Sequence, residues 1–278
     1  MALTSFQRSV CRLLADHRIA SGESYVAGAS ALNELIAASR VSMDIDLFHD
    51  TEEALEASWD ADRHLLETHG FEVRVIRERR SFVEAEVGKN RETVLMQWAR
   101  DSAYRFFPLV RHPDFGLALH PFDLATNKVL ALVGRLEVRD WVDLIHASDR
   151  LQPLGYLAWA ACGKDPGFSP AGILEHAARS ASYSAAEVLA LAFATEPPDP
   201  ADLSRRWHAM LTTARQIVEG LPHTEVGRCV LSHEGTLFAG NARGLGHALD
   251  HGDLVFHSGR IRGAMPELKA PPGERLAP

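Results

Sequence analysis

The sequence predicts an α+β protein in which a mixed sheet with packed helices precedes a mainly helical C-terminal lobe and a terminal β element. Three alternating segments, 71–77, 81–87 and 93–99, predict neighbouring strands, and Gly88-Lys89-Asn90 supplies a turn between the last two. Helical periodicity then dominates from residue 121 to about residue 220. We therefore expect a core at 1–120, a helical lobe that completes a cleft at 121–225, and a short β element with a flexible tail at 226–278.

The first half of the chain alternates short strands with amphipathic helices. Residues 4–19 place apolar side chains at helical spacing, and Gly70 stands where glycine commonly follows the last turn of a helix. The other elements expected in this half are strands at 25–27 and 43–48 and helices at 30–38 and 51–69.

The second half is expected to be helical until about Gly220. Asp123 can cap the helix that carries Lys128, and Gly134 is expected to break it. The glycine-rich run 240–246 lacks the strand and helix context of a phosphate-binding loop, so we interpret it as a turn. Further helices are expected at 137–148, 154–161, 171–179, 185–193 and 201–219, strands within 228–239 and 253–262, and a frayed tail at 269–278.

Composition excludes some classes of protein. The 278 residues are 46% hydrophobic, which suffices for a substantial core, and the net charge of −8 is unlike that of a general nucleic-acid coat protein. Arg74, Arg77, Arg79 and Arg80 form the best candidate for a local RNA-binding patch. The alternative is a solvated edge strand, which charged residues protect from pairing with other chains.

The spacing of the cysteines and the hydropathy of the sequence indicate in which cellular compartment the protein is expected. Cys11, Cys162 and Cys229 are far apart and form no C-x-x-C pair, which indicates reduced thiols. The first residues lack the apolar core of a signal peptide, and no run approaches the ~20 apolar residues of a membrane span. We therefore expect a cytoplasmic protein with no membrane partner.

The motif Asp44-Ile45-Asp46 is the feature most informative about chemistry. Side chains two apart on a strand point to the same face, so two carboxylates would lie side by side. Adjacent carboxylates repel each other unless a cation lies between them, and Mg²⁺ binds such oxygens together with substrate phosphates. Upstream, Gly28-Ala29-Ser30 separates a strand from a helix whose first N–H groups can hold a phosphate. The combination indicates phosphoryl or nucleotidyl transfer.

Each of these signals has an ordinary alternative. A D-x-D pair is often a solvated strand end, and Gly28 can belong to a plain strand-to-helix turn. Lys128 can be a surface lysine whose stem packs along the helix. Arg139 and Asp143 are spaced i, i+4, so they can pair along one helix face for about a few tenths of a kcal/mol.

Two later motifs, Asp123-Leu-Ala-Thr-Asn-Lys128 and Arg139-Asp140-Trp-Val-Asp143-Leu, complete an ordered set. The set resembles the nucleotidyltransferase superfamily of the DNA polymerase β type, and within it the branch of AbiEii-like toxins of type IV toxin–antitoxin systems. The resemblance covers about residues 20–150. It implies Mg²⁺-dependent transfer of a nucleoside monophosphate from an NTP to a tRNA end or a protein, with a cognate antitoxin as a further partner.

The resemblance also implies roles for individual residues. Asp44 and Asp46 would bind Mg²⁺, and Lys128 would contact the nucleotide phosphates. Asp143 would face the cleft and orient Lys128 or the base. The implied catalytic residues are Asp44, Asp46, Lys128 and Asp143, and the implied nucleotide-binding residues are Gly28, Ala29, Ser30, Lys128 and Arg139.

One position departs from the pattern. Enzymes of this type hold two metals with three carboxylates, but Gln97 stands where the third is expected, and Glu84, Glu86 and Asp101 align poorly with that role. An amide oxygen is a weaker, uncharged ligand. Gln97 and the acidic surface favour one alternative to transfer to RNA or protein, a weakened fold that binds a nucleotide or a partner. The acidic surface, which suits a cationic drug, leaves a second alternative, a small-molecule nucleotidyltransferase of the aminoglycoside-modifying sort.

Overall fold

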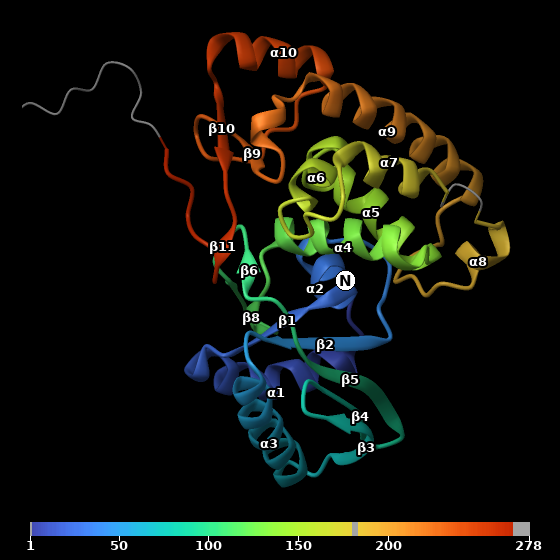
Figure 1. Cartoon of the computed structure of the whole chain (residues 1–278). Coiled ribbons are helices and arrows are strands. Elements are labelled where there is room, and N and C mark those ends of the chain that lie inside the picture. The colour runs from blue at the N-terminus through green and yellow to red at the C-terminus, as the bar shows by residue number, and fades with distance from the viewer. Residues whose placement is uncertain (1, 180–182, 269–278) are drawn as a thin grey trace, which may run out of the picture.

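A computed structural model describes residues 2–179 and 183–268 of the chain. Figure 1 shows a sheet with α1 (Ser5–Ser21) and α3 (Glu52–Thr68) on one side and a group of helices on the other. The expected α+β class, a mixed sheet followed by a mainly helical lobe, is confirmed.

The main sheet has seven strands in the order β3-β4-β5-β2-β1-β8-β7. It is mixed at its centre because β2 runs antiparallel to β1 and parallel to β5. Its strands are β1 (Ser24–Ala27), β2 (Asp44–His49), β3 (Glu72–Arg79), β4 (Phe82–Lys89), β5 (Glu92–Arg100), β7 (Val110–His112) and β8 (Gly116–Ala118).

One face of the sheet is the apolar core beneath α1 and α3. Trp98 of β5 meets Trp59 of α3 with ring centroids 4.7 Å apart, and the indole N–H of Trp98 donates to Asp62 at 3.0 Å. Ile45 and Met96 are fully buried on this face. The alternate residues of β2 and β5 must therefore point to the opposite face.

The helical lobe covers that opposite face. Its first helix, α4 (Pro121–Arg135), packs against α2 (Gly28–Leu35), α5 (Val138–Arg150) and α6 (Leu154–Ala161). The long helix α9 (Pro200–Gly220) packs against α6 farther from the sheet, as Figure 1 shows. The other helices are α7 (Pro170–Arg179), α8 (Ala185–Leu189) and α10 (Ala242–His251).

The C-terminal segment returns to the core. β9 (Cys229–Ser232) and β10 (Leu254–His257) pair beside the lobe, and β11 (Arg260–Ile261) pairs with β6 (Tyr104–Arg105). The ring Nε2 of His257 lies 2.8 Å from the backbone oxygen of Phe106. The end of the described chain thus joins the lobe to the sheet-bearing part.

Two predictions about α4 were wrong. The helix runs through Gly134 to Arg135, and its C-cap is Leu136, whose φ of 52° is left-handed. Its N-cap is His120, whose side chain accepts a hydrogen bond from the Phe122 N–H at 3.2 Å, and not Asp123. A single glycine costs a helix only about 1 kcal/mol, which the tertiary packing of α4 offsets.

The glycine-rich run 240–246 is not a turn, because it contains the first residues of α10. Asn241 caps this helix by accepting from the Gly244 N–H at 3.0 Å. Leu245 and Ala248 are buried, so packing of one face outweighs the poor helix propensity of glycine.

Other element boundaries differ from the expected ones. The expected helix at 185–193 ends at Leu189, and the C-terminal strands are shorter than their alternating segments. β6, β7 and β8 were not predicted, because two or three residues carry no readable alternation. The expected frayed tail, 269–278, lies outside the described residues.

The arginine run lies at an edge of the sheet. Arg74, Arg77 and Arg79 belong to β3, the outermost strand beside β4, and Arg74 pairs with Glu86 at 3.0 Å. All three cysteines are buried and unpaired. Within 2–179 and 183–268, no helix has the length and apolar character needed to cross a membrane.

Asp123 organises the junction between sheet and lobe. Its carboxylate accepts from the backbone N–H groups of Phe106 at 2.8 Å and Phe107 at 3.0 Å, and Nζ of Lys164 lies 2.9 Å from it. Lys164 also donates to the Asn127 side chain at 2.7 Å. Burial lowers the pKa of Lys164, so the nearby Asp123 charge is needed to keep this lysine protonated.

We expect Asp123→Ala to lower the free energy of unfolding by about 3–5 kcal/mol, because it leaves a buried ammonium without its counter-charge. Asp149→Ala removes an exposed ion pair with Arg206 and should cost less than about 1 kcal/mol. Urea unfolding followed by circular dichroism measures both values. Equal losses for the two variants would contradict this role of Asp123.

Candidate active site

Asp44 and Asp46 project from the same face of β2. Ile45 between them is buried in the core, so both carboxylates point toward the helical lobe. Asp46 pairs in register with Ala27 on β1 and with Gln97 on β5. The acidic pair therefore lies beside the point where β1 passes into α2.

Gly28, the first residue of α2, allows the helix to approach this pair. Its φ is +67°, and a Cβ at this position would lie 1.7 Å from Oδ2 of Asp46. Because glycine has no Cβ and adopts positive φ without strain, it is the residue that fits here. The backbone at the start of α2 thus lies directly against the Asp46 carboxylate.

A cavity of about 650 Å³ opens between the sheet and α4. Asp44, Asp46 and Gln97 line it from the sheet, and Lys128 and Arg135 line it from α4. Its two walls therefore carry opposite charges. Also among its lining residues are Gly28, Ala29, Ser42, Asp101 and Arg139.

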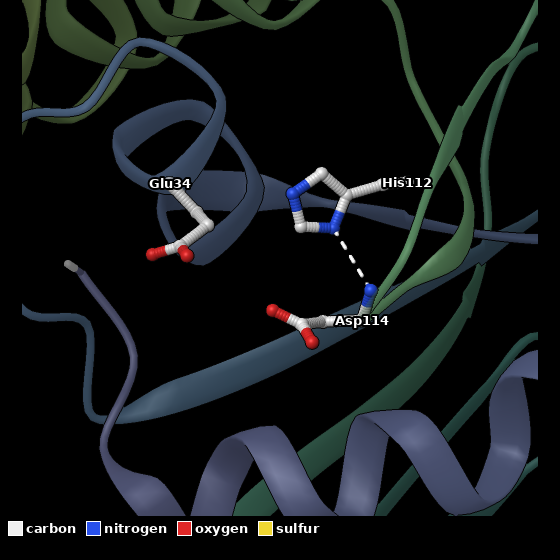
Figure 2. Close-up of side chains that lie close together, drawn as sticks. All are labelled: Glu34, His112 and Asp114. Carbon is white, nitrogen blue, oxygen red and sulfur yellow. Dashed lines mark hydrogen bonds between the residues drawn. The ribbon is translucent and has the colours of Figure 1, made fainter.

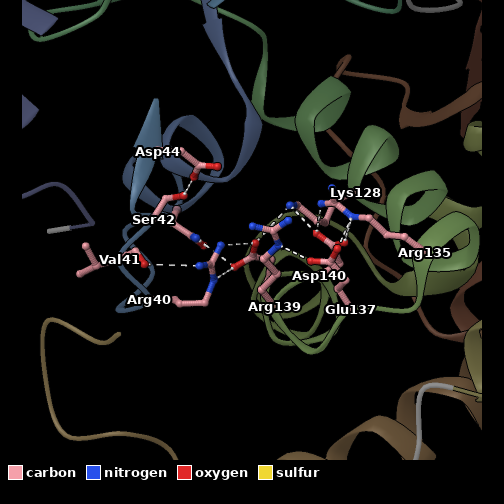
Figure 3. A network of polar contacts seen from close by, with 11 residues as sticks. Arg40, Val41, Ser42, Asp44, Lys128, Arg135, Glu137, Arg139 and Asp140 are labelled. Atoms are coloured by element: carbon pink, nitrogen blue, oxygen red, sulfur yellow. Dashed lines mark hydrogen bonds and ion pairs between the residues drawn. The ribbon is translucent and has the colours of Figure 1, made fainter. Parts of the chain in front are cut away.

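Protein groups occupy only part of the hydrogen-bonding capacity of the Asp44 and Asp46 carboxylates. Burial, and then the neighbouring Asp44 charge, raise the pKa of Asp46 to about 6. The Ser42 hydroxyl donates to Asp44 at 2.6 Å (Figure 3), whereas the Asp46 carboxylate has no hydrogen bond or ion pair within the described part of the chain. Two adjacent carboxylates with free acceptor positions suit a hard divalent cation such as Mg²⁺.

Lys128 lies on the opposite wall and is held by α5. Its Nζ is 2.8 Å from Asp140 and 3.3 Å from Asp143, and its side chain is only 8% exposed. Figure 3 shows the ammonium within this network of carboxylates. Lys128 is therefore not a surface lysine that extends its charge into solvent, and that alternative is wrong.

Asp140 is shared by two cations of the cavity wall. Arg135 donates to both of its oxygens, at 2.6 and 2.9 Å, and Lys128 donates to one of them. Burial alone would raise the pKa of Asp140, but the hydrogen bonds from Arg135 and the charge of Lys128 lower it. Asp140 therefore stays ionised and fixes both cations in place.

Asp143 lies beneath Lys128, fully buried, and does not line the cavity. Asn33 of α2 donates to it at 2.9 Å, and Nη2 of Arg40 donates to it at 2.6 Å. Burial alone would raise the pKa of Asp143, but the charges of Lys128 and Arg40 lower it. Its contact with Lys128 supports a role in positioning that ammonium rather than in touching a substrate.

Arg139 pairs with Glu137 and not with Asp143. Its Nε lies 2.5 Å from the Glu137 carboxylate, and its side chain lines the cavity (Figure 3). The alternative i, i+4 pair that the spacing allowed does not form, because Asp143 instead pairs with Arg40, which comes from another part of the chain.

The expected nucleotide-binding residues of α2 divide into two groups. Gly28 and Ala29 line the cavity, but Ser30 is fully buried, and its hydroxyl has no hydrogen-bond partner among the described residues. Sequence reasoning missed Ser42, which lies in an irregular segment with no periodic signal. It also missed Arg135, although its i, i+7 spacing from Lys128 places the two on one face of a helix.

A second cluster of possible metal ligands lies outside the cavity. Glu34, His112 and Asp114 bring one ligand-type atom each within 4.8 Å of one another (Figure 2). Arg8 forms ion pairs with Glu34, at 2.8 Å, and with Asp114, and Arg12 pairs with Asp114 at 2.6 Å. These guanidinium groups already neutralise both carboxylates, so the cluster ties α1 to α2 and Asp114 rather than forming a metal centre.

Comparison with known proteins found no matching protein family and no matching curated protein. Similar solved structures include MenT4, a nucleotidyltransferase toxin from Mycobacterium tuberculosis H37Rv, with a TM-score of 0.48 and 16% identity over 79% of this chain and 86% of that chain. A candidate nucleotidyltransferase from H. pylori has a TM-score of 0.48 and 16% identity over 78% of this chain and 97% of that chain. JHP933 from Helicobacter pylori has a TM-score of 0.44 and 14% identity over 78% and 95%, respectively. Values this low assign neither a family nor an activity to the chain.

We expect Gly28→Ala to displace the Asp46 carboxylate and to weaken binding of Mn²⁺, a probe for Mg²⁺, by at least about tenfold, or 1.4 kcal/mol. Gly22→Ala is the matched control: its φ is +68°, but no atom lies within 4 Å of the added Cβ. Both variants should lose about 1–3 kcal/mol of stability from backbone strain. Only Gly28→Ala should lose Mn²⁺ affinity in a calorimetric titration, and equal affinities would oppose the assignment.

We expect the stability of the metal-free protein to fall as the pH rises from 3.8 to about 6, since the raised pKa of Asp46 makes the folded state bind more protons than the unfolded chain. Asp46→Asn should flatten this part of the profile and stabilise the protein at pH 7 by about 1–3 kcal/mol. Urea unfolding across pH measures both effects. A profile that the substitution leaves unchanged would exclude a raised pKa.

Proposed function

We propose that the chain is a Mg²⁺-dependent nucleotidyltransferase that moves a nucleoside monophosphate from an NTP to an acceptor hydroxyl. The observation that carries the proposal is that Asp44 and Asp46 face Lys128 and Arg135 across one cavity, beside the start of α2. Paired carboxylates suit a divalent cation, and ammonium, guanidinium and helix N–H groups suit phosphate oxygens. The motif resemblance of residues 20–150 supports the same chemistry.

In the proposed reaction, the acceptor oxygen forms a bond to the α-phosphorus of the NTP. The bond between that phosphorus and the oxygen bridging to the β-phosphate breaks, and pyrophosphate leaves with the electron pair. The proton of the acceptor passes to water. Mg²⁺, when bound, neutralises charge on the phosphates and lowers the pKa of the hydroxyl. Asp44 and Asp46 would hold the ion.

The basic wall would bind the phosphates that leave. Lys128 and Arg135 are held by Asp140 before any ligand arrives, so their side chains lose little further entropy on binding. Arg139, on the same wall, would add a guanidinium to the triphosphate. Asp143 would position Lys128 from below. The resulting charge arrangement is fixed by the protein rather than by the substrate.

The acceptor implied by the resemblance is an RNA end or a protein, and a toxin role with a cognate antitoxin belongs to the same proposal. Gln97 favours a second candidate function, nucleotide binding without turnover, because it replaces a carboxylate with a neutral amide beside Asp46. The two functions differ in whether pyrophosphate is released.

The test is incubation with each α-labelled NTP, Mg²⁺ and one of three acceptor pools: total RNA, total protein or a panel of aminoglycosides. We expect label in one macromolecular pool together with pyrophosphate. Asp46→Asn should reduce labelling by at least about a thousandfold, the loss expected when a metal site is removed. Asp60→Asn, an exposed change on α3, should leave labelling unchanged.

Each other outcome has a distinct meaning. Thermal stabilisation by NTP and Mg²⁺ without pyrophosphate would select the binding function. Label in the aminoglycosides would select the small-molecule acceptor. Labelling by Asp46→Asn at the rate of the unchanged protein would refute the site itself.

A further inference from the structure

A row of three side chains crosses the sheet at the cavity. Glu84 of β4 pairs in register with Gln97 of β5, and Gln97 pairs with Asp46 of β2. Paired residues on neighbouring strands project from the same face, and the strands lie ~4.8 Å apart. Gln97 therefore stands between a glutamate on one side and the acidic pair on the other.

The hydrogen bond from Gln97 fixes which way its amide faces. Its Nε2 donates to Oε1 of Glu84 at 3.1 Å. An ionised carboxylate only accepts hydrogen bonds, so the reverse orientation would bring two acceptors together. The amide oxygen is consequently the end of the amide that does not contact Glu84, and Gln97 lines the cavity that Asp46 also lines.

We propose that Gln97 is a third, neutral oxygen ligand of the divalent cation held by Asp44 and Asp46, and that Glu84 is the residue that positions it. This inference depends on the proposed function. Three ligand side chains then carry two negative charges, which one divalent cation neutralises. A third carboxylate would leave a residual charge that attracts a second ion. The nucleotide-free protein is therefore expected to bind one cation per chain.

The other nearby carboxylates are poorly placed to take this position. Asp101 follows Gln97 by four residues, which is ~13 Å along an extended chain, whereas metal–oxygen bonds are ~2–2.6 Å long. Glu84 lies one strand farther from Asp46, with Gln97 between them. Gln97, in register with Asp46, is thus the side chain that can supply the third oxygen.

The experiment is Mn²⁺ titration of the nucleotide-free protein, with free ion measured by electron paramagnetic resonance. We expect one Mn²⁺ per chain, at least tenfold weaker binding in Gln97→Leu, and several-fold weaker binding in Glu84→Gln. Glu86→Gln is the matched control, since it makes the same change two residues along the same strand face, beside Arg74. It should leave the affinity unchanged. Gln97→Asp should bind a second Mn²⁺.

A double variant separates ligation from mere support of the fold. Glu84→Gln combined with Gln97→Glu keeps one N–H···O contact between the strands and directs a carboxylate oxygen at the cation, so Mn²⁺ affinity should recover and, as for Gln97→Asp, a second Mn²⁺ should bind. Circular dichroism checks that each variant folds. If any single variant fails to fold, failure of this double variant to recover Mn²⁺ binding overturns the inference.

Mn²⁺ binding by the Asp46→Asn and Gln97→Leu variants distinguishes the proposed metal site from the proposed role of Gln97. If the unchanged protein binds no Mn²⁺, or binds it equally after Asp46→Asn, the proposed metal site is wrong. If Asp46→Asn abolishes binding while Gln97→Leu binds as tightly as the unchanged protein, the metal site holds and the role of Gln97 is refuted.

Discussion

Repulsion between the carboxylates of Asp44 and Asp46 is the constraint on which the arrangement of the cavity depends. Strand β2 places both carboxylates on one face of the sheet, and Gly28, which has no Cβ, leaves room for the Asp46 carboxylate. The nearby cations reduce the repulsion without cancelling it, because Lys128 and Arg135 are already paired with Asp140. Burial, and then the neighbouring Asp44 charge, raise the pKa of Asp46, so the folded protein holds this carboxylate with its charge only partly offset by the nearby cations.

The opposite wall differs, since the buried carboxylates described beneath it, Asp140 and Asp143, both have cationic partners. Asp143 contacts Arg40, Asn33 and Lys128, which come from three separate parts of the chain. A buried carboxylate tolerates little displacement when it accepts from several fixed donors. In the network at this wall, three carboxylates contact four cations, namely Arg40, Lys128, Arg135 and Arg139, so an excess of positive charge remains. The site therefore combines an acidic wall with few protein partners and a basic wall whose cations are held in place by carboxylates.

Local pattern was enough to predict the strand that carries the acidic pair and the helix that carries Lys128, because alternation and helical spacing are properties of short segments. It was not enough for contacts between distant segments. The fit of Asp46 against Gly28 depends on how β2 pairs with β1, and the partner of Asp143 is 103 residues away in sequence. For the same reason spacing could offer only Arg139 as a possible partner, although the tertiary fold supplies Arg40.

The pairing of β11 with β6 has a consequence for synthesis of the protein. Tyr104 lines the cavity and lies in β6, which meets residues 260–261 near the end of the chain. Contacts between such distant residues form late, after the intervening chain has left the ribosome. A nascent chain from which residues 260–261 have not yet emerged therefore lacks the partner strand of β6 at this part of the cavity wall.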